Sequence, residues 1–71
     1  MNNGFILLHS VSGGEMILRI DLIEEVMEVN ANEEEAAAYN VGKFTRILYS
    51  GRVLECTESV SKVYLEIRKA K

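Results

Sequence analysis

Proline and tryptophan are absent from these 71 residues, and cysteine, histidine and aspartate occur once each. The single cysteine, Cys56, excludes a disulfide within the chain. One histidine and one aspartate leave few ways to assemble a metal site or a catalytic cluster. We therefore expect no cofactor, no metal and no enzymatic activity.

Long apolar runs are missing as well. The run nearest the start, Phe5–Leu8, has four residues, whereas a signal peptide needs about 7–15 apolar residues and a spanning helix about 20. With a free cysteine and no export signal, the expected location is the cytoplasm, where thiols stay reduced. We expect no membrane span.

The chain has no excess of positive charge. Its net charge is −3 and its isoelectric point is about 5.1, which argues against a general nucleic-acid binder, because such binding rests on phosphate neutralisation. Residues 1–42 carry one cation and eight acids, whereas residues 43–71 carry seven cations and three acids. This separation can steer association with a charged partner, or the two halves can compensate each other inside one fold.

What is present indicates one small globular domain over residues 1–71. Hydrophobic residues make up 48% of the chain and charged residues 27%, which excludes a disordered tail. At this size folding removes only about 60% of the unfolded chain's surface from water. Stability is then marginal unless a partner adds to the core.

Glycine-containing turns divide the apolar runs into β-hairpins, because glycine accepts the positive φ that such turns demand. The turns are Ser12-Gly13-Gly14 and Ser50-Gly51. The pattern predicts about five short strands, at 5–11, 15–20, 24–29, 44–49 and 52–56. For 24–29 a helix continuing from Asp21 is the alternative, because its apolar residues also fit a helical face.

Two segments have helical signatures. In 32–40, Asn32 can cap a helix whose first turn is acidic, although this stretch can equally be a mobile acidic loop. Near the C-terminus, Thr57 or Ser59 can cap a helix in which Glu58 and Lys62 form an i,i+4 pair. Its predicted buried stripe has a 3.6-residue period and consists of Val60, Val63, Tyr64 and Ile67.

The predicted fold class is α+β, with antiparallel hairpins followed by the C-terminal helix and a short helical or loop excursion near 32–40. The strands are apolar on both faces, and one helix about 20 Å long can cover only one face of a sheet. The other face is buried either by partly barrel-like curling or by a second chain, and we favour a homo-oligomer. The candidate self-association residues are Ile6, Leu8, Ile17, Ile47 and Tyr49.

The expected function is that of a small non-enzymatic protein-interaction module, and other kinds of site are less favoured. Basic and aromatic residues of the second hairpin can contact single-stranded nucleic acid, so a small nucleic-acid-associated regulator, of a phage or mobile-element type, is the alternative function. Its candidate contacts are Phe44, Arg46 and Arg52. A His9–Cys56 nucleophilic pair is disfavoured, because a lone cysteine in an apolar strand is usually a small buried hydrophobe. Glu33–Glu35 is disfavoured as a metal site, because consecutive helical side chains diverge.

Three stretches of the chain carry a further pattern, and they are Ser12–Leu18, Leu22–Val26 and Thr45–Val60. In these stretches and in the order of its elements the chain resembles small bacterial flagellar proteins of the FlbD type. The resemblance implies a two-hairpin fold with a closing helix, no catalytic residue and an accessory role in the flagellum. The chain departs from the family pattern in a longer central segment, 31–42, which contains no proline.

Overall fold

The computed structural model describes residues 4–71. Within that range the chain forms five strands, two α-helices and a turn of 3₁₀-helix. In chain order they are β1 (Phe5–His9), β2 (Glu15–Arg19), η1 (Ile20–Leu22), β3 (Ile23–Asn30), α1 (Glu33–Tyr39), β4 (Lys43–Tyr49), β5 (Arg52–Cys56) and α2 (Val60–Ala70). The α+β class is confirmed, and residues 24–29 form a strand and not a helix.

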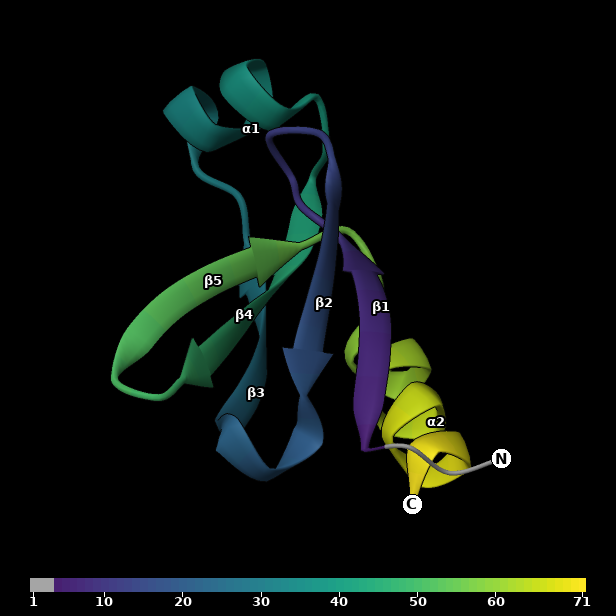
Figure 1. Ribbon diagram of the computed structural model, residues 1–71. Helices are drawn as coiled ribbons and strands as arrows, with labels where there is room; N and C mark the ends of the chain where they lie inside the picture. The colour runs from purple at the N-terminus through teal and green to yellow at the C-terminus, as the bar shows by residue number, and fades with distance from the viewer. Residues whose placement is uncertain (1–3) are drawn as a thin grey trace.

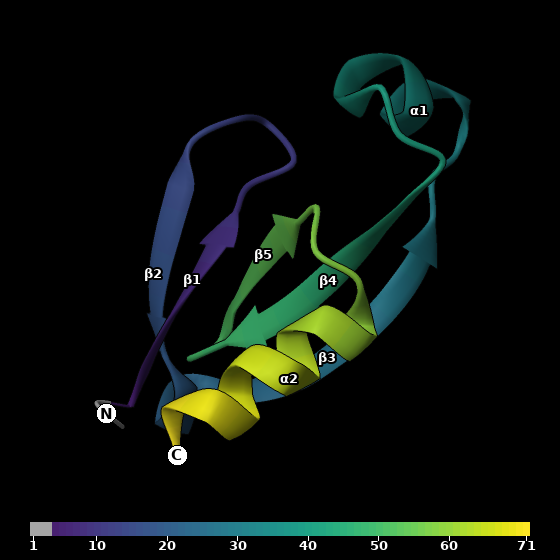
Figure 2. The same ribbon diagram turned by 90° about the vertical axis from the view of Figure 1, so that its right-hand side faces the viewer.

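The strands form two antiparallel sheets, β1–β2 and β3–β4–β5, which lie across each other with α2 against β1 and β3 (Figures 1 and 2). The sheets meet at one corner, where Ser10 bridges Cys56 and the Thr57 N–H donates to the His9 carbonyl at 2.9 Å. They do not close into a barrel, because within residues 4–71 β2 pairs with no strand other than β1. The sheets are therefore not a closed barrel, but their crossing buries Ile6, Leu8, Ile47 and Tyr49 within the single chain, as the curling alternative expected.

Both predicted turns have the geometry that their glycines allow. Ser50 and Gly51 have φ of 50° and 81°, and positive φ at both central residues is the signature of the type I′ hairpin turn. In the first hairpin Gly13 and Gly14 also have positive φ. There β1 ends at His9, two residues earlier than the apolar pattern predicts, because Ser10 turns to bridge β5.

The segment over 32–40 is helical, as one of the two expectations had it. The Asn32 side chain accepts a hydrogen bond from the Glu35 N–H at 2.8 Å, and the Glu35 carboxylate accepts one from the Asn32 N–H at 3.0 Å. This reciprocal capping box fixes the first turn. Asn40 ends the helix with a left-handed φ of 57°. In both views α1 lies beyond one end of the strands (Figures 1 and 2).

One core lies between the two sheets and α2. Its buried members are Ile6, Leu8, Leu18, Ile47, Tyr49, Cys56, Val63 and Ala70. On α2 the expectation for Val63 is confirmed, and Ile67 packs partly buried beside it. The expectation for Tyr64 is wrong: its side chain is exposed, with its ring next to the Arg68 guanidinium. The buried stripe instead continues to Ala70, because α2 packs on β1 and β3 along Val63, Ile67 and Ala70.

Candidate interaction surface

The two faces of the β1–β2 hairpin differ sharply in exposure. Ile6, Leu8 and Leu18 point into the core and are at most 4% exposed. The apolar residues of opposite parity point outward, and their exposed fractions are 46% for Phe5, 45% for Leu7 and 71% for Ile17. Leu7 lies directly opposite Ile17 in the hairpin. The hairpin therefore carries a row of partly exposed apolar side chains on its outer face.

This arrangement corrects the predicted self-association set. Of those residues only Ile17 is on the surface, because Ile6, Leu8, Ile47 and Tyr49 are buried inside the single chain. Alternation within each strand is as predicted, but the set joined residues from opposite faces of the hairpin, because the register places Leu7 opposite Ile17. The crossing of the two sheets turns the Ile6–Leu8 side inward, so the open face is the one that carries Phe5 and Leu7.

Charged and polar residues flank the apolar row at opposite ends. At one end His9 lies opposite Glu15, and at the other Phe5 lies opposite Arg19. These four residues all lie on the outward face of the hairpin, and the side chains of Glu15 and Arg19 are 66% and 55% exposed. We call the six outward residues of the hairpin the outer array; they are Phe5, Leu7, His9, Glu15, Ile17 and Arg19.

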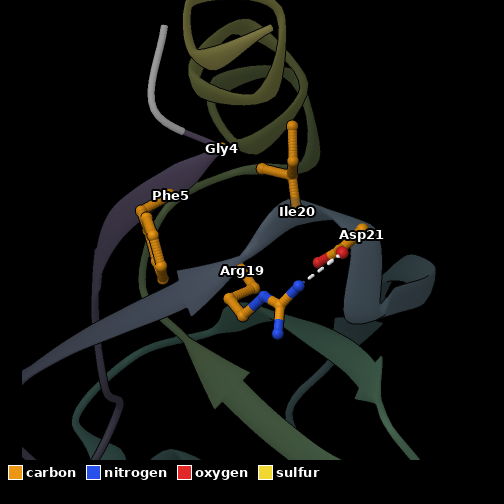
Figure 3. A pocket seen from close by; sticks show the side chains of 5 residues that line it. All are labelled: Gly4, Phe5, Arg19, Ile20 and Asp21. Atoms are coloured by element: carbon orange, nitrogen blue, oxygen red, sulfur yellow. Dashed lines mark hydrogen bonds and ion pairs between the residues drawn. The ribbon is translucent and has the colours of Figure 1, made fainter.

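A shallow depression of about 430 Å³ opens beside the Arg19 end of the outer array. Figure 3 shows Arg19 pointing toward Asp21, with Ile20 directed toward α2. The guanidinium donates to Asp21 Oδ2 at 2.8 Å. An arginine has five N–H donors, so this exposed ion pair leaves donors for a further carboxylate.

The open edge of β2 is less accessible than its face. The Ile20 N–H donates to the Gly4 carbonyl and the Ser10 N–H to the Gly14 carbonyl, so by alternation the backbone groups of residues 15, 17 and 19 point away from β1. At this edge the Arg19 N–H already donates to the Tyr49 hydroxyl at 2.9 Å. The hydroxyl therefore occupies a position that another strand would need.

The outer face of the three-stranded sheet carries a second set of exposed apolar residues. Met27 and Val53 lie on it, around a small depression that Arg46 and Leu48 also line. Here the arginine is already paired within the chain, because the Arg46 guanidinium binds the Glu55 carboxylate at 3.0 Å and lies 3.9 Å from that of Glu35.

The same geometry separates the three residues expected to contact nucleic acid. Phe44 is 3% exposed and lies under the Tyr39 ring, in an edge-on contact at 5.6 Å between centroids. Arg46 is neutralised by two carboxylates. Arg52 pairs with Tyr49 in the ladder and so belongs to the opposite face of the sheet. The three residues therefore form no common stacking platform, and the nucleic-acid alternative stays a prediction.

Glu58 holds the corner between the two sheets. Its carboxylate accepts hydrogen bonds from the His9 ring Nδ1 at 2.6 Å and from the His9 N–H at 2.9 Å. The Glu58–Lys62 pair expected on the helix does not form, because Glu58 precedes the Ser59 cap; Lys62 instead binds Glu66 at 3.2 Å. Sequence spacing gave no signal for His9–Glu58, because the residues are 49 positions apart.

The titrations of this corner follow from its contacts. The hydrogen bond to Glu58 raises the pKa of His9 above 6.5, against a smaller opposing effect of burial, and the charges of Glu58 and Glu15 add to it. Burial is the largest single effect on the pKa of Glu58 and acts to raise it, but the His9 hydrogen bonds, the Glu58 backbone N–H and the charge of His9 together hold that pKa below 4.5.

Cys56 is fully buried beside this corner. Burial raises the pKa of its thiol to about 11, so the thiol keeps its proton at neutral pH and is not a nucleophile there. The His9 ring binds Glu58 and not the thiol.

Residues 4–71 contain no group of three or more histidine, cysteine, aspartate or glutamate side chains that could hold a metal ion. In the same range no helix is long and apolar enough to cross a membrane. No known protein family, curated protein or solved structure matches the chain.

Sequence reasoning missed Phe5, Leu7, Glu15 and Arg19 as surface residues. A signal for two of them was present, because Glu15 and Arg19 lie two residues either side of Ile17 and so share its face. The sequence did not show which face of the hairpin the core would take.

Proposed function

We propose that the protein is a non-enzymatic interaction module that works through protein–protein contact and forms a homo-oligomer. The observation that carries the proposal is the exposed row of Phe5, Leu7 and Ile17 on a hairpin whose other face is buried. An antiparallel sheet that faces water normally alternates apolar and polar residues. A row that stays apolar on the outward side is typical of a surface that a partner covers.

The expected association is weak. A standard interface buries about 800 Å² on each partner, and three partly exposed side chains supply less than that. We expect a dissociation constant on the order of 10–100 µM. An accessory role in the flagellum, of the kind that FlbD-type proteins have, remains a proposal that rests on the resemblance in sequence alone.

Sedimentation tests the proposal over a range of protein concentrations. We expect the weight-average mass to rise from monomer at a few micromolar toward dimer at several hundred micromolar. The melting temperature should rise over the same range, because association stabilises the folded state by mass action. A monomeric mass and an unchanged melting temperature up to millimolar concentration would exclude self-association.

A further inference from the structure

We propose that the outer array binds a second copy of the chain face to face, with Arg19 of each copy over Glu15 of the other. The two-fold axis lies between the copies and runs across the two strands, along the line from Leu7 to Ile17. This inference rests on the proposed homo-oligomer and names its surface and its register.

The first support is the self-complementarity of the outer array. A cation and a carboxylate lie at opposite ends of β2, two residues either side of the exposed Ile17. Rotation by 180° about the Leu7–Ile17 line exchanges the two ends of β2. Two Arg19–Glu15 pairs then form, and Ile17 meets Ile17 of the second copy. On β1 the same rotation sets Phe5 over His9. Like charges never meet in this arrangement, as an isologous contact requires.

The second support is that the same pairing cannot be reached by joining the edges of the two β2 strands. Edge pairing about Ile17 would also set Arg19 opposite Glu15, but it needs the backbone N–H of Arg19. That group donates to the Tyr49 hydroxyl at 2.9 Å, and by symmetry both ends of the new ladder would be blocked. Contact through the faces leaves this hydrogen bond in place.

The third support comes from comparison with the other exposed apolar surface. On the outer face of the β3–β4–β5 sheet, Arg46 is held by Glu55 and Glu35 within the chain. Arg19 binds only the exposed Asp21 among the contacts of its side chain in residues 4–71, and Glu15 approaches His9 at 3.7 Å. The outer array can therefore exchange or share its ion pairs with a second copy at small energetic cost.

Charge reversal with mixing tests this register. Glu15→Lys alone sets Lys against Arg19, and Arg19→Glu alone sets Glu against Glu15, so each variant should self-associate about tenfold more weakly than wild type. An equimolar mixture should recover near-wild-type association, because both pairs across the heterodimer are then of opposite charge. Sedimentation and native mass spectrometry measure the heterodimer, and melting curves of dilute samples check folding.

A matched pair of variants controls for overall charge. Reversing one charge of the −3 chain gives −1 for Glu15→Lys and −5 for Arg19→Glu. Glu34→Lys and Lys71→Glu give the same net charges at exposed positions of α1 and the C-terminus. Mixing this control pair should give no preference for the heterodimer.

The outcomes separate the surface from the function. A wild-type protein that dimerises while Glu15→Lys, Arg19→Glu and Ile17→Lys all dimerise equally well would overturn the proposed surface and leave the homo-oligomer standing. Dimerisation lost only in Ile17→Lys, with no preference on mixing, would overturn the register. A wild-type protein that stays monomeric at every concentration would overturn both proposals.

Discussion

At the scale of single residues, one contact joins the first strand to the segment that precedes the last helix. His9 ends β1 and Glu58 precedes α2, and their short hydrogen bonds hold the corner at which the two sheets meet. The contact raises the pKa of His9 and lowers that of Glu58. The stability of the corner therefore changes both when the pH rises and when it falls.

The sign of each effect on stability follows from linkage. The raised pKa of His9 contributes stability that is complete below 6.5 and is lost as pH rises through the folded-state value. The lowered pKa of Glu58 contributes stability that is present above 4.5 and is lost as pH falls through its folded-state value. The contribution of the pair is greatest between these two ordinary values.

We predict that the melting temperature falls from pH 6 to pH 8 in the wild type and that His9→Gln removes most of this fall. Glutamine keeps a donor near Glu58 but does not titrate. Melting curves across pH 4–8, at one protein concentration, measure the difference between the two proteins. Parallel profiles for wild type and His9→Gln between pH 6 and 8 would show that the pair does not titrate as argued.

At the scale of elements, α2 is joined to the sheets through its buried stripe. Val63 is fully buried, whereas Leu65 on the same helix is 45% exposed. The helix begins at the Ser59 cap, whose side chain accepts from the Lys62 N–H at 3.1 Å, and ends with Arg68 and Lys69 at the negative pole of the dipole. Its position then depends on the packing of Val63 against the strands.

Val63→Asp should unfold the protein, because it buries an unpaired charge and removes a core side chain, which destabilises by about 3 kcal/mol or more. A core of this size rarely supplies more than about 3–5 kcal/mol. Leu65→Asp is the matched control and should melt close to wild type. Cooperative melting of Val63→Asp at the wild-type temperature would contradict the packing of α2. Circular dichroism measures both variants.

The helix α1 contacts the three-stranded sheet through Tyr39 and through Glu35, whose carboxylate lies 3.9 Å from the Arg46 guanidinium. None of its residues is buried, but the Tyr39 ring covers Phe44 and its hydroxyl donates to the Glu55 carboxylate at 3.0 Å. Tyr39→Ala should lower the free energy of unfolding by about 1–2 kcal/mol, because it exposes Phe44 and removes an aromatic contact.

Tyr64→Ala makes the same chemical change at a 61% exposed position of α2 and should change stability by less than about 0.5 kcal/mol. Urea unfolding of both variants measures the two effects. Equal effects would mean that α1 does not shield Phe44.

The elements were predictable because their signals are local. The two hairpins follow from Ser-Gly turns, and the helix over 33–39 follows from Asn32 with Glu35 three residues later. Which face of each element is buried was less predictable. Tyr64 fits the helical period as well as Val63 does, and only the path of α2 over β1 and β3 decides which of them is buried.

At the scale of the whole molecule, the candidate surface depends on how the two sheets cross. Period-two patterning grouped Ile6 with Leu8 and Phe5 with Leu7, but both groups are apolar, so the pattern could not say which side faces the core. The crossing of the sheets is set by long-range contacts, such as the Ser10–Cys56 bridge and the Arg19–Tyr49 hydrogen bond. No short stretch of sequence encodes them.

Cross-linking at position 17 tests most directly whether two copies meet through the outer array. Face-to-face sheets lie about 10 Å apart, a separation that a short bis-maleimide bridges between Ile17→Cys side chains on the two-fold axis. Native Cys56 does not compete, because it is buried and its thiol pKa is about 11. Val53→Cys, at a 58% exposed position on the other sheet, is the control. We predict a covalent dimer from Ile17→Cys and almost none from Val53→Cys at the same concentration; equal yields, or a dimer from Val53→Cys alone, would contradict contact through the outer array.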